Sequence, residues 1–400
     1  MRPRLLVVPH IYADDIAVRE IELARRLTSK FEVFLLKSRH ALHVDGKSAF
    51  TRRVKQAGVA LSAALRSRSQ SKASDGTSII EVPVWQPILA QRLVGVERAS
   101  ALCRLRNRQT LRGLVRDLGI THVLLANELF GVERIPGVRT FFDVVDWFPE
   151  EQFSSARLGR IRAAIGAIDK QVDGTFAVSQ PLCEKLEREC GMQALPLPNG
   201  ADIARLRSVA PAKVSALRQR LGIAEHFAIG YIGNHGSFTG VDLAVNAFLA
   251  ARQRIPNARL LIIGPADTWR ALLEANRAAG VIATGNVAPA EIAEYCNAID
   301  VGVLAQGKSA GTDFAFQIKV VEYSACRKCV VSTPLLNWQR LAWPNIILAE
   351  PNPQAWADAF VQARGMSWEP AWDRIVEAYD WQVLADIAAK AMIGSHGDRN

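Results

Sequence analysis

Residues 227–255, FAIGYIGNHGSFTGVDLAVNAFLAARQRI, contain a strand pattern, a glycine-rich loop and a helix pattern in direct succession. The apolar run 227–233 has the length of a buried strand, and 242–255 carries apolar residues at helical spacing. Glycines in the loop 231–240 let the backbone approach a ligand, and the N–H groups beside them can cradle a phosphate. The loop is neither G-x-G-x-x-G nor a Walker A sequence, so a plain turn is the alternative explanation.

The same alternation of strand and helix continues on both sides of this unit. Towards the C-terminus we predict strands at 258–265, 281–285, 301–306 and 345–350, helices at 267–280, 288–299, 353–364 and 372–393, and a helix followed by a strand within 316–333. Towards the N-terminus we predict strands at 4–11, 31–38, 121–128, 139–146 and 174–180, and helices at 17–30 and 181–190. Alternation of this kind is typical of parallel sheets covered by helices.

A linker at 194–202, with two prolines and an Asn-Gly pair, separates the two series. We therefore predict an α/β protein with two Rossmann-like, doubly wound domains, 1–203 and 204–379, and a helix at about 380–400 that packs back on the first domain. Ligands of such sheets bind beyond the carboxyl ends of the strands. The cleft between two facing domains is thus the expected site.

Composition places the chain in a broad class. Hydrophobic residues make up 49% and charged residues 22% of its 400 residues, as in ordinary globular proteins. No apolar run reaches the roughly 18 residues that a membrane span needs. The start of the sequence lacks the apolar core and cleavage site of a signal peptide, so we expect a cytoplasmic protein.

The six cysteines are scattered through predicted helices and strands, which suits reduced thiols better than a disulfide framework. Cys326 and Cys329 form a C-x-x-C pattern, but no second pair of ligands accompanies them. We therefore expect no metal site.

Lys319 and Glu322 lie three residues apart at the start of the helix predicted within 316–333. A surface ion pair at this spacing contributes only a few tenths of a kcal/mol, and that is the simplest explanation. However, a cation in the first turn opposes the helix dipole, unless it binds an anion such as a phosphate. A carboxylate one turn later can accept hydrogen bonds from the hydroxyls of a ribose. We predict that the two side chains hold one nucleotide rather than each other.

Several stretches, in order, resemble glycosyltransferases of the GT-B fold, in particular the glycosyltransferase 4-like group (glycosyl transferases group 1). IKVVEYSACRKCVVST is similar to the family's LK-x-x-EYMACGKPVV segment, and GYIGNHGSFTGVDLAVNAF to GYxGxxxxxKGVDLLIEAF. LLVVPHIYADDIAVREIELARRL, FFDVVDWFPEE, AVSQPLCEKL, LPNGADIARL and VIATGNVAPAEIAEYCNAIDVGVLAQ have counterparts in the same order. The resemblance covers most of the chain.

The resemblance implies GT-B architecture, a donor that is a UDP- or GDP-linked sugar, no cofactor and no metal, and retention of anomeric configuration. It also implies catalytic roles for Lys319 and Glu322. The implied donor-binding residues are Gly233, Asn234, Gly236, Ser237, Asp313, Gln317, Lys319 and Glu322. The implied acceptor-binding residues are His10, Arg19, Asn127, Asp143 and Asp146. For the aspartates helix capping is the alternative, and for His10 a place in the core.

The sequence departs from the family at three places. Phe314 occupies the position of the first acid of the E-x7-E pattern, with Asp313 beside it. Asn234 and Thr239 replace basic residues that often hold the donor's diphosphate. Asn127 stands, with Glu128, where a histidine is often found near the acceptor. These departures leave the identity of the donor open.

Basic residues are concentrated at the start of the chain. Residues 1–120 contain 22 lysines and arginines but 10 acidic residues, within a net charge of +10 for the chain. The region 47–116 includes a partly apolar stripe, which is typical of a helix on an anionic membrane surface. A solvated basic face is an equally simple explanation. We find no module that reads nucleic acid, so we expect no nucleic-acid partner.

The sequence thus predicts a hexosyltransferase-type glycosyltransferase for surface polysaccharides or glycoconjugates, which transfers a sugar to a glycan or lipid-linked acceptor, in the cytoplasm or on the inner face of the membrane. One alternative is a sugar-nucleotide epimerase of the same fold, which needs acid and base groups beside the sugar. The other is a non-catalytic scaffold, favoured by the missing acid and loop cations.

Overall fold

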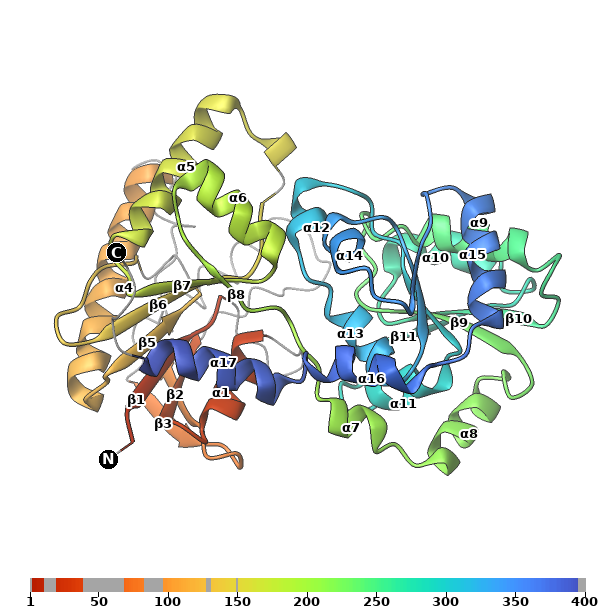
Figure 1. Cartoon of the computed structure of the whole chain (residues 1–400), viewed down its shortest axis with the longest axis horizontal. Coiled ribbons are helices and arrows are strands. Elements are labelled where there is room, and N and C mark those ends of the chain that lie inside the picture. The colour runs from red at the N-terminus through yellow and green to blue at the C-terminus, as the bar shows by residue number, and fades with distance from the viewer. Residues whose placement is uncertain are drawn as a thin grey trace.

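The computed structural model describes residues 2–10, 19–38, 68–82, 96–126, 131–148 and 150–394 of the 400-residue chain. These residues form two separate sheets, each with helices packed on its faces, at the two ends of an elongated molecule (Figure 1). The predicted α/β fold with two Rossmann-like domains is confirmed. In the described residues no helix is both long and apolar enough to cross a membrane.

The first sheet has eight strands in the order β3-β4-β2-β1-β5-β6-β7-β8, and only the pair β3–β4 is antiparallel. Its strands are β1 (Arg4–Val8), β2 (Glu32–Ser38), β3 (Ser69–Lys72), β4 (Ser78–Val82), β5 (His122–Leu125), β6 (Arg139–Val144), β7 (Gly174–Ala177) and β8 (Leu195–Pro196). The helices of this half are α1 (Arg19–Leu27), α4 (Val96–Leu118), η2 (Glu150–Gln152), α5 (Ser155–Asp169) and α6 (Gln180–Cys190).

The second sheet has six parallel strands in the order β11-β10-β9-β12-β13-β14. They are β9 (Phe227–Ile232), β10 (Ala258–Ile263), β11 (Val281–Gly285), β12 (Val301–Leu304), β13 (Cys329–Ser332) and β14 (Ile346–Leu348). Its helices are α7 (Ile203–Arg207), α8 (Pro211–Arg220), α9 (Val241–Ala251), η3 (Asp267–Trp269), α10 (Arg270–Ala275), α11 (Ile292–Ala298), α12 (Ala310–Phe314), α13 (Ile318–Ala325), α14 (Leu336–Leu341), α15 (Pro353–Gly365) and α16 (Pro370–Glu377).

The chain passes between the two halves twice, and the two passages touch. Ala201 and Asp380 form an isolated β-bridge, in which Ala201 N–H donates to the Tyr379 carbonyl at 3.0 Å. A Cβ at Gly200 would lie 2.5 Å from that carbonyl oxygen, so only glycine fits there. After the second passage α17 (Trp381–Ile393) runs along the first half, where its buried residues share a core with β1 and α1 (Figure 1). The limits 1–203 and 204–379 stay predictions.

Several details differ from the sequence-based expectation. No strand was predicted at 69–72 or 78–82, but Ser69–Lys72 and Ser78–Val82 form a hairpin at the edge of the sheet. Its turn is closed by Asp75, which accepts a hydrogen bond from Thr77 N–H at 2.8 Å. The single helix expected at 372–393 is two helices, because the second passage interrupts it. The helices α4, α5, α7, α8, α12 and α14 were not predicted.

Candidate active site between the two domains

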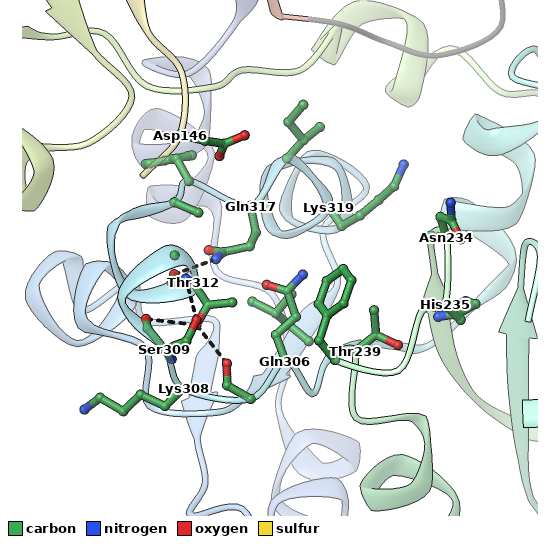
Figure 2. Close-up of a pocket in the computed structure, with 18 of the residues that line it drawn as sticks. Asp146, Asn234, His235, Thr239, Gln306, Lys308, Ser309, Thr312, Gln317 and Lys319 are labelled. Atoms are coloured by element: carbon green, nitrogen blue, oxygen red, sulfur yellow. Dashed lines mark hydrogen bonds between the residues drawn. The ribbon is translucent and has the colours of Figure 1, made fainter. Parts of the chain in front are cut away.

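A cavity of about 790 Å³ lies between the two halves of the molecule. Its second-domain wall comes from the carboxyl ends of β9 and β12, where parallel sheets of this kind bind ligands. Its first-domain wall follows the carboxyl end of β6 and includes Asp146, Trp147, Glu151 and Gln152. Figure 2 shows Asp146 near Gln317, with Lys319 and Asn234 further along the cavity. The predicted cleft between two sheets therefore exists as a site with two chemically different walls.

The glycine-rich loop after β9 forms one end of the second-domain wall. Gly240 has a φ of +69°, and a Cβ there would lie 2.0 Å from the Ala305 carbonyl oxygen, so the turn into α9 requires glycine. No side chain caps the N-terminus of α9. Gly233 and Asn234 line the cavity, whereas Gly236 and Ser237 lie in the same loop outside its lining. Phe238, which was not predicted, lines the cavity with 66% of its surface exposed.

Lys319 also lines the cavity, from the first turn of α13. Its Nζ donates a hydrogen bond to Glu322 Oε2 at 2.6 Å, so the expectation that these two side chains do not pair with each other is wrong. Burial lowers the pKa of Lys319, but the charge and hydrogen bond of Glu322 outweigh it and leave the pKa raised. Glu322 is outside the lining. A phosphate must therefore compete with this carboxylate for the lysine.

Helix α13 is fixed to the glycine-rich loop by a buried tyrosine. Ile232 N–H, at the end of β9, donates to the Tyr323 hydroxyl at 2.8 Å. A Cβ at Gly302 would lie 2.3 Å from the Tyr323 ring, so the glycine on β12 makes room for it. The contact joins the helix that carries Lys319 to the strand that leads into the loop.

Two other predicted donor-binding residues already have structural partners. The Asp313 carboxylate accepts from Leu336 N–H at 3.0 Å, at the start of α14. Gln317 lines the cavity, but its amide donates to the Thr312 carbonyl at 3.0 Å and accepts from Trp338 Nε1 at 2.7 Å. These bonds hold the loop from α12 to α13 in place.

Asp146 is the one predicted acceptor residue that lines the cavity among those the structure describes. Its carboxylate is open to the cleft, yet it lies deep between the domains. Loss of hydration there raises the pKa, against a smaller lowering by the charge of His10. Trp147, Glu151 and Gln152 on the same wall were not singled out from the sequence. The only signal was the WFPEE stretch after the strand.

The other described acceptor residues lie outside the lining. Arg19 and Asp143 form a buried pair through two hydrogen bonds, Nε to Oδ2 at 2.8 Å and Nη2 to Oδ1 at 3.1 Å. His10 Nδ1 lies 2.5 Å from an oxygen of Glu20, which is completely buried. Asn127 lies outside the described residues.

The cations of the cavity are sparse. Lys308 and Lys319 are the two basic residues in its lining as far as the structure describes it, and Lys308 extends away from Lys319 and Asn234 (Figure 2). In the described ranges no three His, Cys, Asp or Glu side chains are grouped as metal ligands would be. The chemistry that the cavity offers is hydrogen bonding to a polyhydroxylated ligand and one lysine for an anion.

Comparisons with known proteins place this geometry in context. Residues 226–364 match the family model described as Glycosyl transferases group 1. No curated protein sequence matches the chain significantly. HepE of Anabaena, solved with UDP and glucose, is similar in structure, with a TM-score of 0.65, 15% identity, and coverage of 98% of this chain and 100% of that one.

Two further solved structures are similar to this chain over nearly its whole length. Sucrose-phosphate synthase of Thermosynechococcus elongatus has a TM-score of 0.68 at 16% identity and covers 98% of each chain. WaaG, a glycosyltransferase involved in lipopolysaccharide biosynthesis, has a TM-score of 0.62 at 14% identity, with coverage of 98% of this chain and 100% of that one. The chain therefore has the GT-B fold, and its second domain matches the glycosyl transferases group 1.

Proposed function

We propose that the protein is a glycosyltransferase that moves a sugar from a nucleotide-diphospho-sugar to a hydroxyl of an acceptor. The observation that carries this proposal is the cavity with two unlike walls. One wall presents a lysine and the glycine-rich loop that leads into α9, a helix whose N-terminus has no side-chain cap. The other presents Asp146, Glu151 and Gln152, which carry polar groups that can hold sugar hydroxyls. The family match of residues 226–364 supports it.

In this reaction the acceptor oxygen forms a bond to the anomeric carbon, and the bond from that carbon to the phosphate oxygen breaks. The nucleoside diphosphate leaves with the electron pair and gains negative charge. Lys319 and the N–H groups at the start of α9 stabilise that charge. Glu322 releases Lys319 and accepts hydrogen bonds from the ribose. We propose retention of configuration, with the acceptor proton passing to the leaving phosphate, and no metal or other cofactor.

We propose a UDP-linked hexose as the donor, with GDP as the second candidate base. HepE was solved with UDP and with UDP-glucose, which supports the first choice. Of the two lysines in the described lining, Lys308 extends away from the glycine-rich loop, and Lys319 is already paired with Glu322. We therefore expect weaker nucleotide binding than in a site with free cations in its glycine-rich loop.

We propose that the acceptor is a lipid-linked or growing surface glycan and that the protein docks on an anionic membrane. Most of the stretch 47–72 lies outside the described residues, so α4 carries the argument. Leu102 and Leu105 on its outer face are 55% and 51% exposed, and Arg98, Arg104 and Arg106 beside them are exposed. Exposed leucines flanked by arginines are typical of a helix that lies in a membrane interface.

Flotation with vesicles that contain anionic lipid tests this surface. Leu102→Ser/Leu105→Ser should reduce flotation. Leu195→Ser, on β8 with 54% exposure, serves as a matched control and should leave it unchanged. Equal flotation of both variants would contradict docking through α4.

A screen of thermal stability against UDP, GDP, ADP and their sugars tests the catalytic proposal, followed by detection of released nucleotide. Stabilisation by one nucleotide and its release from the matching sugar donor are expected. Binding without release in the presence of any acceptor glycan would favour the scaffold. Interconversion of the free sugar nucleotide without transfer would favour the epimerase.

A further inference from the structure

The second-domain segment Phe314–Phe316 is held by the first domain at two backbone carbonyls. Ser179 Oγ, at the start of α6, donates to the Phe314 carbonyl at 2.6 Å. Asn199 Nδ2, in the linker, donates to the Phe316 carbonyl at 2.7 Å. Both donors are more than a hundred residues away in sequence, and the segment they hold leads directly into α13, the helix of Lys319.

Asn199 is itself fixed in one orientation. Its Oδ1 accepts from Arg19 Nη1 at 3.4 Å, while Nδ2 faces the Phe316 carbonyl. A flipped amide would bring its N–H groups against the guanidinium and its oxygen against a carbonyl, so one orientation alone satisfies both neighbours. Arg19 also donates to the Pro198 carbonyl at 2.7 Å, and its buried pair with Asp143 anchors it at the end of β6. The Asn199 amide therefore links the end of β6, through Arg19, to the backbone of Phe316 in the second domain.

Phe314, which occupies the position of the first acid of the E-x7-E pattern, also takes part in the contact between the two domains. Lys185 Nζ lies 4.9 Å from the centroid of the Phe314 ring and 5.3 Å from that of Trp147, which lines the cavity. Lys185 is buried and already neutralised by Glu150 at 3.1 Å and by a second carboxylate at 2.8 Å. A carboxylate at position 314 would face a lysine that is already paired with two carboxylates, whereas an aromatic ring can pack against the charge of that lysine.

We propose that Asn199 is a positioning residue, which, together with Ser179, sets the place of Lys319 relative to the acceptor wall around Asp146. Asn199 lines the cavity, but each polar end of its amide is bonded within the protein, and the role proposed here acts through the Phe316 carbonyl. The second passage of the chain and the ion pair of Arg340 with Glu184 also join the two halves, but neither holds the backbone segment that leads into α13. The two hydrogen bonds fix that segment, and a misplacement of about 1 Å between reacting groups costs up to roughly 100-fold in rate.

This inference rests on the proposed function for its kinetic test, in which Asn199→Asp is compared with Asn345→Asp. Aspartate keeps the size of the side chain and the acceptor for Arg19 but loses the N–H that holds Phe316. Asn345 makes comparable amide bonds, to Ser324 Oγ at 2.8 Å and the Lys328 carbonyl at 3.1 Å, within the second domain. Asn199→Asp should lower kcat at least about tenfold and change the Kd for UDP less than about threefold. Asn345→Asp should lower Tm without lowering kcat.

A distance measurement separates this inference from the proposed function. Spin labels on exposed positions of the two sheets should give a broader distance distribution in Asn199→Asp and in Ser179→Ala than in the wild type or Asn345→Asp. A kcat within twofold of wild type in Asn199→Asp, or unchanged distances in both variants, would overturn the positioning role. If no sugar nucleotide binds at all, the proposed function fails, and the distance distributions alone decide the present inference.

Discussion

Replacement of Lys319 by methionine should separate binding of the phosphate from stability of the fold. Methionine keeps the length of the side chain but removes the charge. A hydrogen bond to a charged group contributes about 1.5–3 kcal/mol, so the Kd for UDP should rise roughly 10- to 150-fold. The change for UMP should be smaller, because the lysine acts on the diphosphate. Isothermal titration calorimetry with UDP and UMP measures both values.

The same replacement leaves Glu322 without its cation. The carboxylate side chain is 14% exposed and lies 2.6 Å from Lys319 Nζ in the wild type. Loss of a fully buried partner costs about 3–5 kcal/mol, but the pair is partly open to water, so we expect about 1–2 kcal/mol. Chemical denaturation of Lys319→Met should show this loss.

The double variant Lys319→Met/Glu322→Gln is the control. A neutral glutamine needs no cation, so stability should return towards that of the wild type while UDP binding stays weak. The reasoning is refuted if the double variant binds UDP within about twofold of the wild type, since Lys319 would then act only as the partner of Glu322.

Three further outcomes follow from the described contacts. Tyr323→Phe leaves the buried Ile232 N–H without an acceptor, which costs about 1–3 kcal/mol, and hydrogen exchange at that amide should accelerate. Arg327 has a φ of +58° and an ion pair with Asp373 at 2.8 Å. Replacement by glycine or by alanine removes this pair, but glycine adopts a positive φ without strain, so Arg327→Gly should be at least as stable as Arg327→Ala in thermal unfolding. Burial lowers the pKa of His10, but its buried carboxylate partner raises it more. The stabilisation is complete below the unfolded-state pKa near 6.5 and is lost as pH rises through the raised pKa, so the wild-type Tm should fall there and that of His10→Gln should not.

The periodic parts of the sequence predicted most of the fold because buried strands and their covering helices leave a local pattern. Strand β3 left none, since polar Ser69–Lys72 gains its strand character only from pairing with β4. The break between α16 and α17 was also not predicted from the helical pattern of 372–393. It arises where the chain passes back between the domains, near the predicted domain limit at 379. The local signal is Asp380, which caps α17 by accepting a hydrogen bond from Gln382 N–H at 2.8 Å.

The candidate site was predictable where one short segment supplies both geometry and chemistry. The glycine-rich loop and Lys319 meet that condition, and both line the cavity. Pairings between distant segments were not predictable: Arg19 and Asp143 are 124 residues apart, and each alone had the pattern of a residue that faces a ligand. Burial of the pair removes both from the surface that a ligand touches.

The place of α17 has a consequence for the order in which the protein is made. Trp381 and Leu384 complete a core that contains Leu5 and Val7 of the very first strand. On a ribosome, the first sheet therefore emerges long before the helix that covers one of its faces, and the entire second sheet is synthesised in between. The second half can fold as it emerges, whereas the first must wait with apolar surface uncovered. Expression of the first sheet alone should for this reason require α17 to be supplied by fusion to its own end.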